Sequence, residues 1–361
     1  MKIMTVVGAR PQFVKVAAVS RLINTHKYQG INEVIVHTGQ HYDQNMSQSF
    51  FQELQIPDPT YNLSVGSGSQ GAQTGAIMMK LEELVEKESP DWMLVYGDTN
   101  STLAGALVAA KTPVRLAHVE SGLRSFHWGM AEEVNRVITD RLSDILFCPS
   151  NTAYENLLSE GCKGEFYMTG DVGYDSFIYY SKKVEHDSIL QNLNLNKKKY
   201  ILTTLHRAEN TDNPKILSDI LSVLRSLSLR VKVILPIHPR TKKVIEKYSI
   251  STEGLHIIDP VSYLIMIALL TNARIVITDS GGLQKESYFA KVPCITLRDE
   301  TEWIETLENG WNRLVSPNDC NTIRSTAEML LQVDFTNKIY LESYGTGEAS
   351  TKILDILINH S

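Results

Sequence analysis

The chain has 361 residues, of which 43% are hydrophobic and 21% charged, a composition typical of a globular protein with room for two domains. Its formal net charge of −6 gives no general attraction to nucleic acid or to anionic membranes, so an anionic ligand would need a local basic site. No apolar run reaches the roughly 18 residues that a membrane span requires. The short apolar start, residues 1–7, ends at once in Gly8, Arg10 and Pro11, which favours a first strand over a signal peptide.

Short apolar runs alternate with helical patterns along the whole chain. Strands are expected at 2–7, 33–37, 92–96, 113–118, 144–148 and 165–168, and in a second series at 200–205, 231–235, 255–258, 274–278, 292–296 and 313–315. Between them, helical periodicity is clearest at 74–87, 214–228 and 322–332. Because the strands lack strict alternation, they are typical of a parallel sheet covered on both faces. The predicted fold class is α/β, doubly wound.

A more polar segment, 170–198, separates the two strand series and ends in a run of lysines. We therefore predict an N-terminal domain of residues 1–170 and a C-terminal domain of residues 171–361. The last predicted helix, 348–359, is a candidate to pack back on the N-terminal domain. Two similar α/β domains facing each other across a cleft are the simplest architecture, and ligands of such sheets bind beyond the carboxyl ends of the strands.

The four cysteines show neither close pairing nor the spacing of metal ligands. This favours buried free thiols in a reducing, cytoplasmic compartment.

The first strand is followed by GARPQFVK, residues 8–15, which is neither a GxGxxG fingerprint nor a Walker A loop. A nicotinamide dinucleotide is therefore disfavoured. Gly8, Pro11 and the cations Arg10 and Lys15 beside a helix start suit a phosphate or another anion. A plain turn with two solvated cations explains the same residues equally well.

Carboxylates follow two further strands of the first half. Asp98 occupies a position where a helix cap is commoner than a catalytic acid. Glu120 is a poor turn former and a poor cap, which favours a functional role. Glu132 and Glu133 open a helix, and its periodicity places Glu132 and Arg136 opposite the apolar stripe. That pattern favours an exposed i,i+4 pair, although the same face could also line a cleft.

In the second half, two strands each end in a histidine and an arginine, His206-Arg207 and His238 with Arg240. Two histidines in equivalent positions indicate a basic wall. The segment 278–286, TDSGGLQKE, follows another strand and begins a helix. Its Ser-Gly-Gly start is typical of a backbone N–H nest for phosphate, although it could also be a simple tight turn.

Taken together, these segments resemble the non-hydrolysing UDP-N-acetylglucosamine 2-epimerase family. The matching pieces, in family order, are GARPQFVK, GDTNSTLAGA, HVESGLRS, EEVNR, LHRAEN, PIHPR, TDSGGLQKE and RDETEW. The resemblance implies two Rossmann-like domains in the GT-B architecture. It also implies interconversion of UDP-GlcNAc and UDP-ManNAc by elimination and re-addition of UDP through 2-acetamidoglucal. It implies neither NAD nor an obligatory metal, no nucleic-acid or membrane partner, and a homodimer that supplies polysaccharide precursors.

The resemblance also implies roles at the matching positions. The acid/base carboxylates would be Asp98, Glu120 and Glu132, with His206 as a further catalytic residue at the diphosphate. The substrate-binding residues would be Arg10, Lys15, His238, Ser280, Gly281, Gly282 and Glu286, of which Glu286 would hold the ribose.

Some positions depart from the family pattern. The usual GTRPE opening reads GARPQ here, the usual PEE reads Ala131-Glu132-Glu133, and Ala208 replaces a second arginine. Residues 64–73 lack the basic residue that many members use at an allosteric site. GARPQF and HRAENTD are more similar to the subgroup that epimerises UDP-2,3-diacetamido-2,3-dideoxy-glucuronate. A GT-B glycosyltransferase is the more distant alternative.

Overall fold

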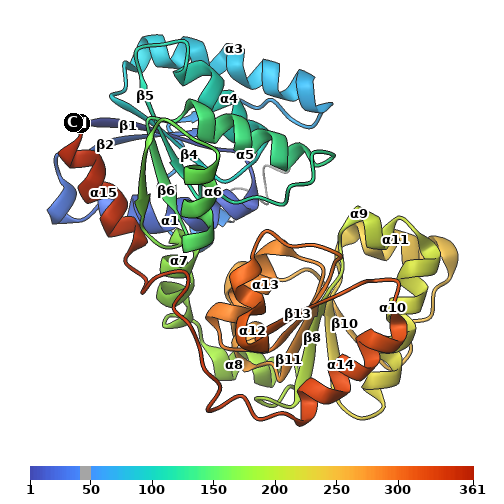
Figure 1. The fold of residues 1–361 in the computed structure, drawn as a ribbon. Helices are drawn as coiled ribbons and strands as arrows, with labels where there is room; N and C mark the ends of the chain where they lie inside the picture. Colours follow the sequence, from blue (N-terminus) through green and yellow to red (C-terminus); the bar gives the residue numbers. More distant parts are fainter. Residues whose placement is uncertain (41–49) are drawn as a thin grey trace. The chain divides into compact units, whose positions relative to one another are not determined.

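A computed structural model describes residues 1–40 and 50–361, which divide into two compact units (Figure 1). Unit 1 comprises Met1–Ile178 and Glu342–Ser361, and unit 2 comprises Tyr179–Leu341. Each unit has one parallel sheet with helices on both of its faces. The predicted fold class, α/β with two Rossmann-like doubly wound domains, is confirmed.

The sheet of unit 1 has seven strands in the order β3-β2-β1-β4-β5-β6-β7. In chain order the strands are β1 (Lys2–Val7), β2 (Asn32–His37), β3 (Tyr61–Asn62), β4 (Trp92–Tyr96), β5 (Arg115–Val119), β6 (Ile145–Cys148) and β7 (Glu165–Met168). All neighbours are parallel. Every residue of the central strand β4 is buried, which explains its continuous apolar sequence.

The helices of unit 1 cover both faces of this sheet (Figure 1). They are α1 (Arg10–Ile23), η1 (His26–Tyr28), α3 (Gln70–Glu88), α4 (Asn100–Ala109), α5 (Ala131–Leu142), α6 (Asn151–Ser159) and α15 (Ala349–Asn359), and α7 (Val172–Ser181) begins in unit 1 and ends in unit 2. The C-terminal helix α15 packs on α1. The buried carboxylate of Asp175 accepts hydrogen bonds from the backbone N–H groups of Ala349 (3.1 Å) and Ser350 (2.7 Å) at the start of α15. This contact fixes the end of the chain to the first unit.

The sheet of unit 2 has six strands in the order β10-β9-β8-β11-β12-β13. In chain order they are β8 (Tyr200–Thr204), β9 (Lys232–Pro236), β10 (His256–Ile258), β11 (Ile275–Thr278), β12 (Cys294–Leu297) and β13 (Asn312–Val315). The helices are α8 (His186–Asn192), α9 (Ala208–Thr211), α10 (Pro214–Ser228), α11 (Pro239–Tyr248), α12 (Tyr263–Asn272), α13 (Gly281–Phe289), η2 (Ile304–Gly310) and α14 (Cys320–Gln332).

Both sheets reverse their strand order beside the first strand of the unit. The reversal falls between β1 and β4 in unit 1, and between β8 and β11 in unit 2. Loops diverge at such a point, so the carboxyl ends of these strands are where ligands of open α/β sheets bind.

Most predicted strands agree with the observed ones within two residues, but β3 is an additional short strand that the sequence did not predict. Among the described residues, no helix is both long and apolar enough to cross a membrane. All four cysteines are free thiols. Burial raises the pKa of Cys148 and of Cys294 to about 12, so these two thiols are unreactive.

Candidate active site

Lys15 and Glu120 form an ion pair at the carboxyl edge of the unit 1 sheet. Lys15 lies in the second turn of α1, and Glu120 directly follows β5. The Lys15 ammonium donates a hydrogen bond to Glu120 Oε1, and the two side chains are only 12% and 7% exposed. An ammonium this close favours the charged form of a carboxyl group. Two of the predicted site residues, more than a hundred positions apart, therefore meet at this edge.

The backbone at this edge is left-handed at two positions, Gly97 (φ +63°) and Glu120 (φ +69°). A Cβ on Gly97 would lie 3.1 Å from Lys15 Nζ and 3.3 Å from Glu120 Oε1, so glycine is needed both for its conformation and for its lack of a side chain. Positive φ is uncommon for a residue such as glutamate and is concentrated at functional sites. The backbone of Glu120 therefore supports a functional role.

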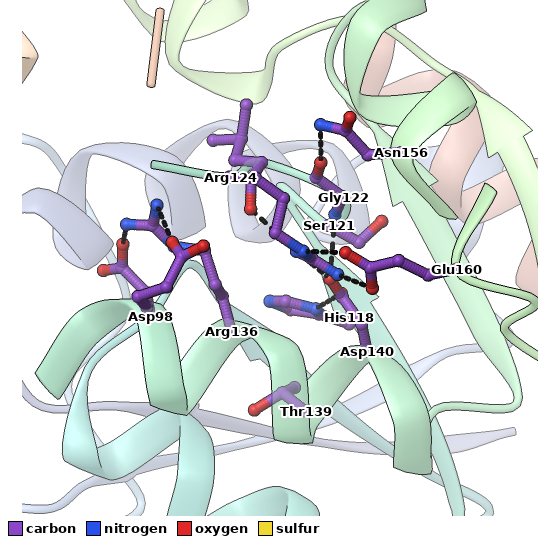
Figure 2. Close-up of polar contacts among 12 residues, drawn as sticks. Asp98, His118, Ser121, Gly122, Arg124, Arg136, Thr139, Asp140, Asn156 and Glu160 are labelled. Atoms are coloured by element: carbon purple, nitrogen blue, oxygen red, sulfur yellow. Dashed lines mark hydrogen bonds and ion pairs between the residues drawn. The ribbon is translucent and has the colours of Figure 1, made fainter. Parts of the chain in front are cut away.

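Asp98 is paired with Arg136 of α5 in the same part of unit 1 (Figure 2). The second guanidinium nitrogen of Arg136, Nη1, donates to Glu133 Oε2 at 3.0 Å. The helix cap that position alone favoured for Asp98 is wrong, because Thr99 caps α4 by accepting a hydrogen bond from the Thr102 N–H. The side chain of Asp98 remains 31% exposed, so it is held by a cation and still accessible.

The exposed Glu132–Arg136 pair expected from periodicity is also wrong. Arg136 is buried and pairs with Asp98 and Glu133, whereas Glu132 is exposed and has no hydrogen bond or ion pair with any described residue. The buried face of α5 is polar, formed by Glu133, Asn135, Arg136, Thr139 and Asp140. This polar face packs against the loops that follow β4 and β5, which supply its charged and polar partners. The apolar stripe of α5 is therefore not its buried face.

Glu133 lies in the first turn of α5 and is only 1% exposed. Its carboxylate accepts hydrogen bonds from the backbone N–H groups of Ser125 and Phe126, both at 2.9 Å, and from the Ser125 hydroxyl at 3.0 Å. Glu133 thus orders the loop that follows Glu120 and orients Arg136. The Glu133–Arg136 spacing of three was the one signal of this contact in the sequence.

The loop after β1 is arranged differently from a simple phosphate cradle. The backbone N–H groups of Gly8 and Ala9 donate to the side-chain oxygen of Gln12, at 2.8 and 3.1 Å. A Cβ on Gly8 would lie 2.2 Å from the hydroxyls of both Ser101 and Thr38, so Gly8 permits close packing within the unit. These two N–H groups are therefore already paired, and an anion at this segment would have to be bound by the side chains of Arg10 and Lys15.

Those cations have different surroundings. Lys15 is held by Glu120, as described above, and the guanidinium of Arg10 lies 4.2 Å above the ring of Phe50. Arg10 is exposed at the first position of α1, where it could contact a bound anion.

In unit 2, His206 follows β8 and is held by the buried Asp279, which follows β11. His206 Nδ1 lies 3.1 Å from Asp279 Oδ1, and the backbone N–H groups of His206 and Arg207 donate to Oδ2, both at 3.0 Å. Burial raises the pKa of Asp279, but the hydrogen bonds and charge of His206 and the backbone N–H of Arg207 outweigh it, so the net shift is downward. The His238 ring lies 5.9 Å from that of His206, which brings the two predicted histidines together.

The Ser280-Gly281-Gly282 segment begins α13, directly after β11. The Ser280 hydroxyl caps the helix by accepting a hydrogen bond from the Leu283 N–H at 3.3 Å. The first N–H groups of a helix have no acceptor within it, so those of Gly281 and Gly282 can bind an anion. A Cβ on Gly282 would meet nothing closer than Ser280 Oγ at 4.0 Å, so the helix start is open at this residue, whereas a Cβ on Gly281 would lie 3.0 Å from Glu302 Oε1. Glu286, the predicted ribose ligand, lies on α13 and is half-buried.

The two units carry different groups. Unit 1 brings together cation-held carboxylates, and unit 2 brings together two imidazoles and has a helix start at Ser280. The first set suits proton transfer and the second suits a phosphate group. Sequence reasoning found most of these residues but missed Asp279, because an aspartate between a strand and a helix cap gives no separate signal.

A family model described as UDP-N-acetylglucosamine 2-epimerase matches residues 24–358 of the chain. The chain belongs to this epimerase family. Its relatives include a protein of Methanococcus maripaludis named UDP-N-acetylglucosamine 2-epimerase homolog, which is 50% identical, with 99% of this chain and 100% of the relative covered. The UDP-2,3-diacetamido-2,3-dideoxy-D-glucuronate 2-epimerase of Pseudomonas aeruginosa is 45% identical, with 99% of each chain covered.

Among solved structures of the epimerase family, the Methanocaldococcus jannaschii UDP-GlcNAc 2-epimerase in complex with UDP-GlcNAc and UDP is similar to this chain. The TM-score is 0.89 and the identity 39%, and the match covers 99% of this chain and 100% of the other. The family resemblance expected from the motifs is thereby confirmed.

Proposed function

We propose that this protein is a non-hydrolysing UDP-sugar 2-epimerase that interconverts UDP-GlcNAc and UDP-ManNAc. The observation that carries the proposal is the pair of cation-held carboxylates, Glu120 with Lys15 and Asp98 with Arg136, at neighbouring strand ends in a member of the epimerase family. Both lie beside the point where the strand order reverses, where such folds bind ligands.

The reaction needs proton transfer on two faces of the sugar ring. One carboxylate removes the proton from C2 while the bond from C1 to the diphosphate oxygen breaks, and the electrons of the C–H bond form a C1=C2 double bond. UDP leaves with the electrons of the C1–O bond, so nothing is oxidised or reduced. A proton is then delivered to the opposite face of C2, and UDP returns to C1. Two carboxylic groups are required because one group cannot serve both faces.

The candidates for these two roles are Glu120, Asp98 and Glu132. Glu120 is oriented by its ion pair with Lys15, and Asp98 by its ion pair with Arg136. Glu132 is exposed on α5, so it could reach a ligand only from the solvent side of that helix. We therefore expect Glu120 and Asp98 to contribute most to turnover.

We propose that unit 2 binds the nucleotide. Phosphate oxygens would accept hydrogen bonds from the helix start at Ser280, Gly281 and Gly282, and His206 would donate to the diphosphate that departs. Asp279 fixes the ring of His206 through Nδ1, which directs the other ring nitrogen away from Asp279. His238 and Glu286 would complete this part, with Glu286 accepting hydrogen bonds from the ribose hydroxyls.

A second candidate substrate is UDP-2,3-diacetamido-2,3-dideoxy-glucuronate. The GARPQF and HRAENTD segments are similar to that subgroup, and the Pseudomonas aeruginosa relative named for this sugar shares more residues with the chain than the Methanocaldococcus structure does. The proton chemistry at C2 would be unchanged, so the candidates differ only in what the site must accept at C3 and C6.

The cellular setting is also a proposal. We expect a cytoplasmic enzyme that supplies precursors of surface polysaccharides, which is consistent with its free buried thiols.

We also propose a homodimer. It would cover the apolar face of α5, where Val134, Val137 and Ile138 are only half-buried. Light scattering of the purified protein tests the dimer.

Parallel assays with the two UDP-sugars test the proposed function. We expect a manno-configured UDP-sugar to form from UDP-GlcNAc without an acceptor, and kcat/KM for the two sugars decides between the substrates. Release of free sugar and UDP would indicate a hydrolysing enzyme instead. Turnover only in the presence of an acceptor would indicate a glycosyltransferase.

A further inference from the structure

His118 lies on β5, two residues before Glu120, and its side chain is fully buried (Figure 2). Its two ring nitrogens each contact one oxygen. Nδ1 lies 2.7 Å from Asp140 Oδ1 on α5, and Nε2 lies 2.7 Å from the backbone carbonyl oxygen of Gly97. Both distances are those of strong hydrogen bonds.

The Gly97 carbonyl oxygen has no hydrogen to donate and can only accept. The other carboxylate oxygen of Asp140, Oδ2, accepts from the Gly122 N–H (3.1 Å) and from Arg124 Nη1 (2.7 Å), which is the environment of an ionised carboxylate. With Asp140 ionised beside Arg124, its Oδ1 can only accept as well. His118 therefore satisfies both contacts only if each of its ring nitrogens carries a hydrogen.

The surrounding charges agree with a positive ring. Arg124 donates to Asp140 and also to both oxygens of Glu160, at 2.7 and 2.8 Å (Figure 2). With His118 as imidazolium, two cations balance the two carboxylates of this cluster. With a neutral His118, the cluster would hold two carboxylates and one cation, and the fully buried Asp140 would share that cation with Glu160, whose side chain is 23% exposed.

We infer that His118 is a positioning residue, held as an imidazolium by Asp140, that fixes the Gly97–Asp98 turn for the chemistry of Glu120 and Asp98. Its Nε2 holds the carbonyl of Gly97, whose Cα faces the Lys15–Glu120 ion pair. The next residue, Asp98, pairs with Arg136. One buried ring thus orients the turn that touches both carboxylates. This inference rests on the proposed function for its catalytic part only.

The charge of His118 is tested without any activity assay, by nitrogen-15 NMR of the full chain labelled on histidine. The His118→Gln variant assigns the signal, and free histidine in the same buffer gives the shifts of a neutral ring. At pH 8 we expect both ring nitrogens of His118 to show imidazolium shifts. The shift pattern of a neutral tautomer would overturn the inference.

The positioning role is tested by kinetics of His118→Gln. We expect the variant to bind UDP within about twofold of the wild type, because UDP is proposed to bind unit 2. We expect kcat to fall by about 100-fold, the effect of misplacing reacting groups by about 1 Å, with little change in KM. A folded variant with wild-type kcat would overturn the positioning role.

Failure of the proposed epimerase function can be distinguished from failure of the inference about His118. If the wild-type protein epimerises neither sugar, the proposed function fails and the NMR result still decides the charge of His118. If His118→Gln does not fold, substitution of the other histidines one at a time assigns the wild-type signal by elimination, and the NMR measurement then decides the charge of His118.

Discussion

At the scale of single residues, the proposed site depends on pairing two carboxylates, Glu120 and Asp98, each with a cation. Glu120 is held by Lys15, and Asp98 by Arg136, whose guanidinium is only 3% exposed. A carboxylate held in this way is oriented before substrate arrives, so the proposed reaction needs little reorganisation. The sequence indicated Glu120 and Asp98 by their positions after strands, but the pairing could not be predicted because the partners lie 105 and 38 residues away.

Glu120→Gln tests the role of the first carboxylate. The amide keeps the shape of the side chain but cannot accept a proton, so we expect kcat to fall by at least 100-fold, within the range found for general bases. UDP affinity should be nearly unchanged, because unit 2 is proposed to hold the nucleotide. Steady-state kinetics and calorimetric titration with UDP measure the two effects. A variant with near-normal kcat would exclude Glu120 as the base.

Gly97→Ala tests the turn between the two ion pairs. Alanine at φ +63° costs about 1–2 kcal/mol, and its Cβ would press on Lys15 and Glu120. We therefore expect lower stability in urea unfolding together with a lower kcat.

Gly75→Ala is the matched control for that substitution, because Gly75 lies inside α3 with nothing within 4 Å of the added Cβ. There we expect about 1 kcal/mol of stabilisation and wild-type kcat. The account of the turn would be contradicted if both alanine variants behaved alike.

At the scale of elements, α5 shows how a helix can position the residues of the proposed site. The inward face of α5 is polar, and its Asp140 joins β5 to the loop after it through His118 and Gly122. Hydrophobic periodicity predicted the opposite face, because it assumes that the apolar stripe is the buried one. The helix itself was predictable from sequence. Its rotation was not, because that is set by charged partners on distant loops.

Asp140→Asn measures how much that cluster stabilises unit 1. Removing one charge from a buried network costs about 3–5 kcal/mol, so we expect a loss of this size in urea unfolding at pH 7. The pKa of Asp140 is lowered in the folded state, so its contribution is fully present above the ordinary aspartate pKa and is lost as pH falls through the lower folded value. The difference between wild type and variant should therefore shrink in acid. A difference that is constant or grows towards low pH would contradict this assignment.

Gly282→Ala separates ligand binding from folding at α13. The added Cβ meets no protein atom closer than 4.0 Å and alanine favours a helix, so stability should be equal or higher. If phosphate approaches this helix start, the methyl group should weaken UDP binding by about tenfold, or about 1.4 kcal/mol. Calorimetric titration with UDP measures this, and unchanged affinity would remove Gly282 from the phosphate site.

At the scale of the whole molecule, the fold class and the order of strands and helices followed from the sequence. Buried parallel strands have continuous apolar runs, as in β4 and β6, and each such run can be recognised in the sequence by itself. The short strand β3, of two residues, has no such run and was not predicted. The close packing at Gly8 and the hydrogen bonds of Gln12 could not be predicted either, because they depend on groups from separate segments of the chain.

The central claim is that the chain removes and replaces the C2 hydrogen of an intact UDP-sugar. Proton NMR of UDP-GlcNAc, and separately of the diacetamido-uronate, with the protein in D2O tests it most directly. We predict a manno-configured product that carries deuterium at C2 and keeps its UDP. Unchanged proton signals at C2 for both sugars, with active protein and long incubation, would contradict the account.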